Sequence, residues 1–431
     1  MKKLLLLISI AILFIIACST EGGEKQLVAK RQAHFISMDE ARSQVIDILN
    51  IPSTGSRSNS FFGGKNITSS FTRNYTYYLN GREQNCDMYI FNFGDNEGYA
   101  AVLSDVRTDQ LLALTTEGRV NEVETDLDAL FPPLSFYEME EPDTIDHGDS
   151  LLYPEPFDEY GEWTISTTGY GLYSYPNPNG EGNIAANFGM TKVRWHQEAP
   201  LNCYCFTDGG QQAVAGCAAS ALAILLSCYE YPNSYEGYSF NWSEMKRYPE
   251  AEDLSSTYQN QVARLMEVLG RSQNLHMNYG IISSGSSLNY VPQTLNNLGF
   301  SNTGTVTSYS LNDVINEINA GYPVIVSGKD QDGNNGHAWV IDAYLKRSRE
   351  VRHYSASGAL IGTSTQTNYY VFCNWGKKLS SNIEHNFNGF YLNNYFNPVD
   401  MITITGSGVI VNQNPTQYYI NDLQMVKSVR Q

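Results

Sequence analysis

The chain has 431 residues, of which 42% are hydrophobic and 17% charged, so it is long enough for two or three domains and can bury a substantial core. This composition excludes a wholly disordered chain. The 45 acidic residues outnumber the 27 basic ones and give a formal net charge of −18, which argues against nucleic acid as a partner.

The first residues have the pattern of an export signal. Two lysines precede an apolar run over 4–16, which is shorter than the about 20 residues of a membrane-spanning helix. The run closes with alanine and Cys18, which resembles the bacterial lipobox, where the cysteine carries the lipid. We expect residues 1–17 to be a lipoprotein signal peptide and 18–35 a polar tether. An ordinary signal peptide with an incidental cysteine is the alternative.

The next segment has the pattern of a small α+β domain. Apolar residues at helical spacing predict a helix from Met38 to Leu49. Short runs bounded by turn residues predict strands at 75–79, 88–93, 99–104 and 111–115. We assign residues 36–131 to this domain.

A change of composition follows the small domain. Residues 132–189 contain Pro-Pro, Pro-Glu-Pro and Pro-Asn-Pro together with a run of acidic residues. Proline, glycine and acid in this density predict an exposed linker that a protease can cut.

The remaining chain, 190–431, has the pattern of a larger globular domain. We expect helices at 218–229, 258–269, 291–298 and 311–320, because apolar residues recur at helical spacing or form a continuous run of helix formers. We expect strands at 323–327, 338–344, 369–373 and 389–392. Helices followed by antiparallel strands predict an α+β fold.

Cys217 is the candidate nucleophile. It stands at the start of the predicted buried helix, directly after Gly216, which permits a tight backbone turn. Unpaired backbone N–H groups and the helix dipole at such a position favour a thiolate. Cys228 lies inside the same helix and is better explained as a small buried hydrophobe.

His337 is the candidate general base. It follows a glycine-rich turn, opens an apolar strand, and lies 337 − 217 = 120 residues after the cysteine. Asn374 ends a later strand and is expected to orient the imidazole, with Trp375 shielding that hydrogen bond. An oxyanion hole would use the Cys217 backbone N–H and the side-chain amide of Gln211. Each motif alone is weak, but their order in one domain is informative.

The other cysteines give no metal or cofactor assignment. Seven cysteines are present, and removal of Cys18 leaves six in an export context where disulfides are permitted. Their spacing fixes no pairing. The pair Cys203 and Cys205 has no matching cysteine or histidine cluster nearby, so we expect no metal and no cofactor.

Over residues 190–400 the chain resembles streptopain and its relatives, which are papain-fold cysteine endopeptidases made as zymogens. The motifs that carry the resemblance are Gly216-Cys217-Ala218-Ala219, Met277-Asn278-Tyr279-Gly280, Ser283-Ser284-Gly285-Ser286, Gly336-His337-Ala338-Trp339, Asn374-Trp375-Gly376 and Asn388-Gly389-Phe390-Tyr391-Leu392. The resemblance implies a papain-like peptidase domain with a helical part and an antiparallel sheet part, preceded by an inhibitory pro-domain over 36–131.

The resemblance also implies site roles. Cys217 would be the nucleophile and His337 the base, Gln211 would serve the oxyanion hole, and Asn374 and Trp375 would support the histidine. Residues Ser284, Gly285 and Gly336 would line the substrate cleft. One departure concerns the loop beside the cleft, since the family usually continues Asn-Trp-Gly-Trp-Gly-Gly, whereas Lys377 and Lys378 follow Gly376 here.

The expected activity is therefore that of an exported, lipid-anchored cysteine endopeptidase of the bacterial envelope, with protein or peptide substrates and its own pro-domain as inhibitor. Anchoring would be through the lipid at Cys18, in the outer membrane, and release of the enzyme part after cleavage stays open. Two alternatives remain. One is a papain-like amidase that cuts cell-wall peptides, and the other is an inactive lipoprotein that uses the fold for binding.

Overall fold

The structure is a computed structural model of the chain. It describes residues 34–50, 65–122 without 96, 109 and 117, 131, 133–136, 157–378 without 331, 332 and 334, 388–393, 396, 402–405, 408–411, 419 and 421–431. The predicted signal peptide, Cys18 and nearly all of the tether lie outside the described residues.

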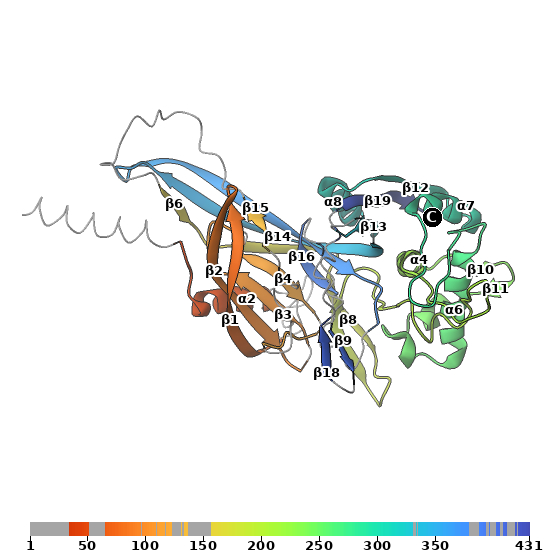
Figure 1. Ribbon diagram of the computed structural model, residues 1–431. Helices are drawn as coiled ribbons and strands as arrows, with labels where there is room; N and C mark the ends of the chain where they lie inside the picture. Colours follow the sequence, from red (N-terminus) through yellow and green to blue (C-terminus); the bar gives the residue numbers. More distant parts are fainter. Residues whose placement is uncertain are drawn as a thin grey trace, which may run out of the picture.

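A large, mostly antiparallel sheet runs through the described part of the molecule (Figure 1). Its main path has the order β12-β19-β13-β14-β15-β16-β4-β3-β2-β1-β5, and β6 and β7 pair with β14 beside that path. The strands are β1 (Ile67–Leu79), β2 (Arg82–Phe93), β3 (Tyr99–Leu103), β4 (Leu111–Thr115), β5 (Ser135–Phe136), β6 (Phe157–Tyr160), β7 (Thr164–Thr168), β12 (Asn302–Ser308), β13 (Val324–Lys329), β14 (Gly336–Tyr354), β15 (Leu360–Asn374), β16 (Gly389–Leu392) and β19 (Asn421–Arg430).

Three short hairpins and the helices complete the described elements. The hairpin strands are β8 (Gly171–Pro176) with β9 (Asn183–Phe188), β10 (Ser234–Tyr235) with β11 (Tyr238–Ser239), and β17 (Ile402–Thr405) with β18 (Gly408–Val411). The helices are α2 (Met38–Leu49), α4 (Cys217–Tyr229), α5 (Trp242–Met245), η1 (Ala251–Asp253), α6 (Ser256–Gly270), η2 (Leu288–Tyr290), α7 (Val291–Leu298) and α8 (Leu311–Asn319). The predicted α+β class is confirmed, and each predicted helix and strand is present.

We call the described residues 34–122, which hold α2 and β1–β4, the N-terminal unit. Helix α2 begins with a capping box, in which the Ser37 hydroxyl accepts from the Glu40 backbone N–H and the Glu40 carboxylate accepts from the Ser37 backbone N–H. Its buried face, which includes Ala41 and Val45, packs near β2. The unit therefore contains the helix and the four strands that the sequence predicts for this segment.

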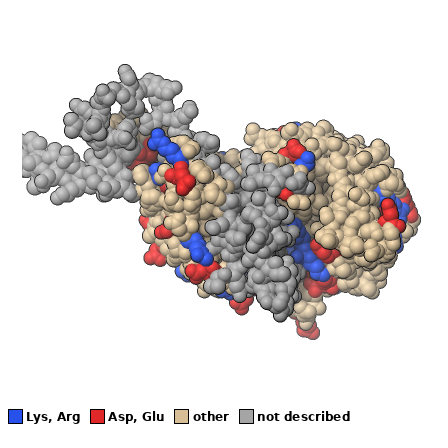
Figure 2. Space-filling model, viewed as in Figure 1, with Lys and Arg blue, Asp and Glu red and all other residues tan. Residues whose placement is uncertain are grey.

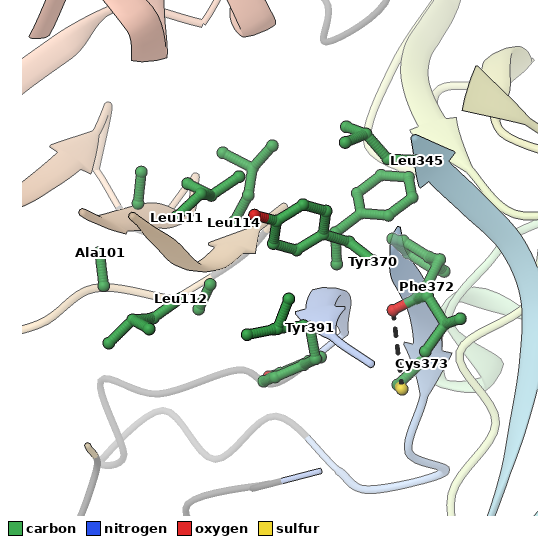
Figure 3. Packing of buried hydrophobic residues seen from close by; sticks show 14 of the residues in the cluster. Ala101, Leu111, Leu112, Leu114, Leu345, Tyr370, Phe372, Cys373 and Tyr391 are labelled. Carbon is green, nitrogen blue, oxygen red and sulfur yellow. Dashed lines mark hydrogen bonds between the residues drawn. The ribbon is translucent and has the colours of Figure 1, made fainter. Parts of the chain in front are cut away.

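The N-terminal unit shares its sheet and its core with the C-terminal part of the chain. Strand β4 pairs with β16, so that the two sheets form one. Figure 3 shows one packed cluster built from β3 and β4 (Ala101, Leu111, Leu112, Leu114), from β14 and β15 (Leu345, Tyr370, Phe372, Cys373) and from β16 (Tyr391). Two separate globular domains joined by a linker are therefore not what the chain forms.

The prediction of an open linker over 132–189 is wrong for its start, where β5 pairs with β1, and for residues 157–188. Strands β6 and β7 pair with the outer edge of β14, and β8 and β9 form a hairpin. The cause is the length of β14, whose distal half extends beyond β13 and offers an unpaired edge to this segment. Residues 137–156, which include much of the acidic and proline-rich stretch, lie outside the described residues.

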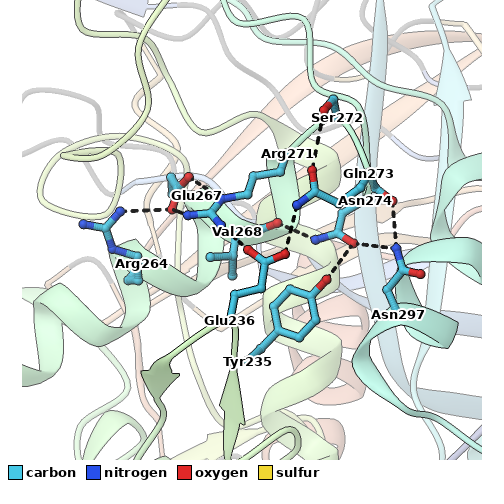
Figure 4. Close-up of polar contacts among 10 residues, drawn as sticks. All are labelled: Tyr235, Glu236, Arg264, Glu267, Val268, Arg271, Ser272, Gln273, Asn274 and Asn297. Atoms are coloured by element: carbon cyan, nitrogen blue, oxygen red, sulfur yellow. Dashed lines mark hydrogen bonds and ion pairs between the residues drawn. The ribbon is translucent and has the colours of Figure 1, made fainter.

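A second core lies among the helices, at the end of the molecule away from the N-terminal strands (Figure 1). Helix α4 is buried on nearly all sides, which fits its run of apolar helix formers, and it packs on α6 and β14. Figure 4 shows the polar contacts at the C-terminal end of α6, where the Arg271 guanidinium donates to Glu267 at 2.8 Å and also bonds to Glu236. These contacts fix the start of the segment that leads to one wall of the site.

None of the helices in the described ranges has the length and apolar character needed to span a membrane. On the face drawn in Figure 2, charged side chains form small scattered groups among mostly uncharged residues. This distribution agrees with the low charged fraction of the sequence, 17%.

Candidate active site

Gly216 and Cys217 form the sharp entry into α4. Gly216 has φ +91°, and a Cβ there would lie 2.1 Å from the Met277 methyl carbon and 3.1 Å from the Ser284 carbonyl oxygen. Only glycine fits both the backbone angle and this close approach. The turn therefore places Cys217 at the first position of a buried helix, as the sequence predicts.

Cys217 and His337 line the same cavity, which has a volume of about 670 Å³. We call it the catalytic cavity. The 282–289 loop forms part of its lining, and the ends of β13 and β14 form another part. The two residues come from the helical part and from the sheet, so the cavity lies where these parts meet.

The position of His337 is set by its strand and by one main-chain acceptor. His337 is the second residue of β14 and pairs with Gly328 of β13. Its Nε2 lies 2.8 Å from the Trp375 carbonyl oxygen. Because a carbonyl oxygen only accepts, Nε2 carries a proton, and in the neutral ring Nδ1 is then the basic nitrogen. The imidazole also stacks against Trp339, Trp375 and Tyr419.

The electrostatics of Cys217 differ from the expectation of a favoured thiolate. Burial raises the pKa of the Cys217 thiol above its usual value. The backbone N–H groups of Ala338 and Ala218, and the charge of Lys377, lower the pKa but do not reverse the direction. The effect of burial on the pKa of the thiol is therefore larger than that of the donors at the helix start.

The side chain of Asn374 does not contact His337 in the way the sequence suggests. Its Nδ2 donates to the Val193 carbonyl oxygen at 2.7 Å, and its Oδ1 accepts from the Gly376 backbone N–H at 3.4 Å. The prediction that this amide orients the imidazole is therefore corrected. The amide is turned toward Val193 because the chain path before α4 offers a buried carbonyl there.

Gln211 is likewise away from the catalytic cavity. Its side chain is exposed, in a tight turn where the Thr207 and Gln211 main chains bond to each other at 2.9 Å. Gln197 lines the cavity instead, and its carbonyl accepts from the Ala215 backbone N–H at 2.8 Å, which brings it beside the helix entry. Local spacing favoured Gln211. The available signal for Gln197 is Trp195, a buried residue two positions before it.

The predicted cleft residues Ser284, Gly285 and Gly336 all line the catalytic cavity. The Ser284 hydroxyl donates to the Val214 carbonyl oxygen at 2.7 Å and accepts from the Gly280 backbone N–H at 3.0 Å. The serine therefore ties the loop to the segment before Cys217. The same loop carries Ile282, whose side chain is 93% exposed at the rim of the cavity.

The remaining thiols have no comparable surroundings. The six cysteines in the described ranges form no disulfide with one another. Burial raises the pKa of Cys228 to about 11, which fits a structural role inside α4. Among the described residues no group of histidine, cysteine and carboxylate side chains is arranged to hold a metal ion.

The segment that carries this site is similar to known cysteine peptidases. Residues 195–383 match the profile of the Peptidase C10 family, and the match includes both Cys217 and His337. A fragment of Prevotella intermedia prointerpain A aligns with a TM-score of 0.44 and 16% identity, covering 83% of this chain and 99% of that one. The active wild-type interpain A cysteine protease of the same organism aligns with a TM-score of 0.38 and 21% identity, covering 56% and 93%. No curated protein sequence matches the chain.

Proposed function

We propose that the protein is a papain-like cysteine endopeptidase, with Cys217 as nucleophile and His337 as general base. The observation that carries the proposal is that a cysteine at a helix start and a histidine with a fixed Nε2–H line one cavity. The Peptidase C10 match over the same residues supports it. The pairing also explains how a thiol with a raised pKa can ionise. When the proton moves from Cys217 to the imidazole of His337, the resulting imidazolium stabilises the thiolate.

The reaction then proceeds by acyl transfer. His337 Nδ1 takes the thiol proton, and the Cys217 sulfur attacks the peptide carbonyl carbon to form a tetrahedral intermediate. The imidazolium returns the proton to the departing amine, which leaves a thioester on Cys217. Water, deprotonated by the same imidazole, hydrolyses the thioester and restores the thiol. No cofactor takes part in these steps.

The intermediate carries a negative charge that needs preorganised donors. The Cys217 backbone N–H has no acceptor within the helix because it is in the first turn. Gln197 replaces Gln211 as the proposed side-chain donor, since its partly buried amide lines the catalytic cavity. Trp375 stacks on the His337 ring and accepts its Nε2 hydrogen bond. Asn374 contributes only as the residue before Trp375, through its backbone.

We further propose that the chain is made as a zymogen, with residues 36–131 as the inhibitory pro-domain and with a cut within 137–156. The proposal rests on the resemblance of the N-terminal segment to such pro-domains and on the composition of that stretch. Export and lipid anchoring at Cys18 follow from the lipobox pattern. Protein or peptide substrates, the pro-domain and the membrane are the expected partners, and nucleic acid is not.

The decisive experiment compares wild-type protein with Cys217→Ala on casein, with Cys228→Ala as the matched control. Loss of hydrolysis in the first variant and retention in the second support the assignment; retained hydrolysis in Cys217→Ala refutes it. N-terminal sequencing of both proteins after storage tests the zymogen, because self-processing requires the thiol. A change of the Cys18→Ser protein from the membrane fraction to the soluble one tests the anchor.

Two other functions stay testable with the same proteins. A cell-wall peptide amidase would release peptides from murein and leave casein intact. An inactive binding lipoprotein would cut neither substrate in any form, including protein that has lost its N-terminal unit.

A further inference from the structure

The N-terminal unit does not contribute to the described lining of the catalytic cavity, whose residues lie between 197 and 424. It nevertheless contacts the C-terminal part of the chain within the sheet, where Thr115 of β4 pairs with Gly389 of β16. If the unit affects the reaction through these contacts, it does so indirectly, by changing the position of residues that line the cavity. The contacts of Asn388, directly before β16, show such a route.

Asn388 is hydrogen-bonded on two sides. Its side-chain Oδ1 accepts from the Trp375 backbone N–H at 2.8 Å. Its main-chain carbonyl accepts from the Thr116 hydroxyl at 3.2 Å and from the Thr116 backbone N–H at 3.3 Å. Thr116 and Asn388 are each 6% exposed, so bulk water does not compete for these hydrogen bonds. Thr116 belongs to the N-terminal unit, at the end of β4.

Trp375 is the residue that holds the histidine. Its N–H bonds to Asn388, and its carbonyl oxygen accepts from His337 Nε2 at 2.8 Å. Gly376 follows with φ +63°, a sharp bend that makes the carbonyl direction depend on how Trp375 is anchored. A shift of Asn388 would therefore turn the acceptor of His337.

Strands β4 and β16 are tightly fitted at this point. A Cβ at Gly389 would lie 2.7 Å from the Thr115 Cα and 2.8 Å from the Leu114 carbonyl oxygen. The close approach of β4 fixes the residue before Gly389 as well, because consecutive residues share a peptide plane. Separation of β4 from β16 would remove both Thr116 bonds at once.

We infer that Asn388 is a positioning residue through which the N-terminal unit acts on His337. The hydrogen bonds run from Thr116 to Asn388, from Asn388 to Trp375, and from Trp375 to the imidazole. The inference rests on the proposed function only in taking His337 as the base. It assigns a route of regulation that needs no residue of the unit inside the catalytic cavity.

The test measures the rate of iodoacetamide alkylation at Cys217 in the full chain between pH 5 and pH 10, by peptide mass spectrometry. The variants are Asn388→Ala, Asn388→Asp and Thr116→Val. Asn92→Ala is the matched control, because the Oδ1 of this buried asparagine also accepts from a backbone N–H, that of Val120 at 2.9 Å, but the residue lies within the N-terminal unit.

We expect Asn388→Ala to slow alkylation at pH 7 roughly tenfold, as expected for loss of a buried hydrogen bond, and to move the profile to higher pH. Asn388→Asp keeps the acceptor and should restore most of the rate. Thr116→Val should shift the profile less, in the same direction, and Asn92→Ala should not shift it.

An unchanged profile in Asn388→Ala overturns the inference, and so does a profile that responds to Asn388→Ala but not to Thr116→Val. The proposed function is tested separately by His337→Ala. If the wild-type profile does not change in that variant, Cys217 and His337 do not act as a pair, and both proposals fail.

Discussion

His337 and Trp375 are joined by a 2.8 Å hydrogen bond from the imidazole Nε2 to a main-chain carbonyl, and their rings stack with centroids 6.0 Å apart. A main-chain acceptor cannot be removed by a side-chain substitution. The orientation of the imidazole therefore depends on the backbone path of the segment after β15, and the predictions for neighbouring side chains differ accordingly.

Asn374→Ala is expected to affect stability more than chemistry. The lost Nδ2 bond to the Val193 carbonyl leaves a buried acceptor unpaired, which costs about 1–3 kcal/mol. Turnover of a peptide substrate should fall less than about tenfold, whereas His337→Ala should lower it about 10²–10⁴-fold. Denaturant unfolding and kcat measured on both variants check this. A loss of kcat in Asn374→Ala as large as that in His337→Ala contradicts it.

Gln197→Ala should lower kcat about 10²–10³-fold if its amide stabilises the oxyanion. Its backbone bond to Ala215 remains in the variant, so the helix entry should keep its place. Gln211→Ala is the matched control and should retain normal activity, because that side chain is exposed outside the catalytic cavity. Equal effects of the two substitutions on kcat, or a larger effect of Gln211→Ala, would exclude Gln197 from this role.

Lys377→Gln should move the ionisation of Cys217 to higher pH. The lysine charge lowers the pKa of the thiol, so its removal raises that pKa further. The expected readout is an alkylation profile displaced toward alkaline pH at low ionic strength, with a smaller displacement in high salt. Lys378→Gln is the control, because that ammonium bonds to the Ala199 carbonyl oxygen at 2.6 Å and pairs with Glu252. If Lys378→Gln displaces the alkylation profile by the same amount, the effect is not specific to Lys377.

Asp342 should make the fold less stable as the pH rises from about 4 to about 6. Burial raises the pKa of this carboxyl from 3.8 to about 6, and its Oδ2 accepts from the Thr191 hydroxyl at 2.6 Å. The folded chain therefore holds the proton more tightly than the unfolded chain, and the stability present below pH 3.8 is lost as the pH passes 6.

The size of that loss is about 3 kcal/mol, the equivalent of the change in pKa. Asp342→Asn should abolish this part of the pH dependence of the unfolding free energy in urea titrations. Asp208→Asn, which alters an exposed carboxylate, serves as the control. A wild-type stability that rises over the same pH interval, with no difference in Asp342→Asn, would show the sign to be wrong.

Local patterns in the sequence predicted the helices and the central strands. The boundaries of α2 and α7 agree with the predicted ones, because helical periodicity and turn residues mark both ends. The distal half of β14 was not predicted. Its polar residues include Arg347 and Arg349, which are buried because their guanidinium groups stack on Trp163, a residue of the predicted linker. No local pattern signals a buried arginine whose partner comes from elsewhere in the chain.

The same limit applies to the site. Cys217 and His337 were predicted because each is marked by its own surroundings, a glycine before a buried helix and a turn before a strand. The position of Gln197 in the cavity lining could not be predicted from spacing, since its carbonyl bonds to the Ala215 backbone N–H, 18 residues away (215 − 197 = 18). The partner of His337 is a carbonyl group, which every residue carries, so its identity depends on the path of the chain.

Strand β16 is an interior strand only while the N-terminal unit is in place, because its two neighbours are β15 and β4. All four of its residues are buried, including Phe390 and Leu392. Departure of the unit would turn β16 into an open sheet edge with apolar side chains, the kind of edge that recruits another strand. The solubility of a processed enzyme would then depend on what covers this edge, and a shed N-terminal unit, a second enzyme molecule and an extended peptide would compete for the same four residues.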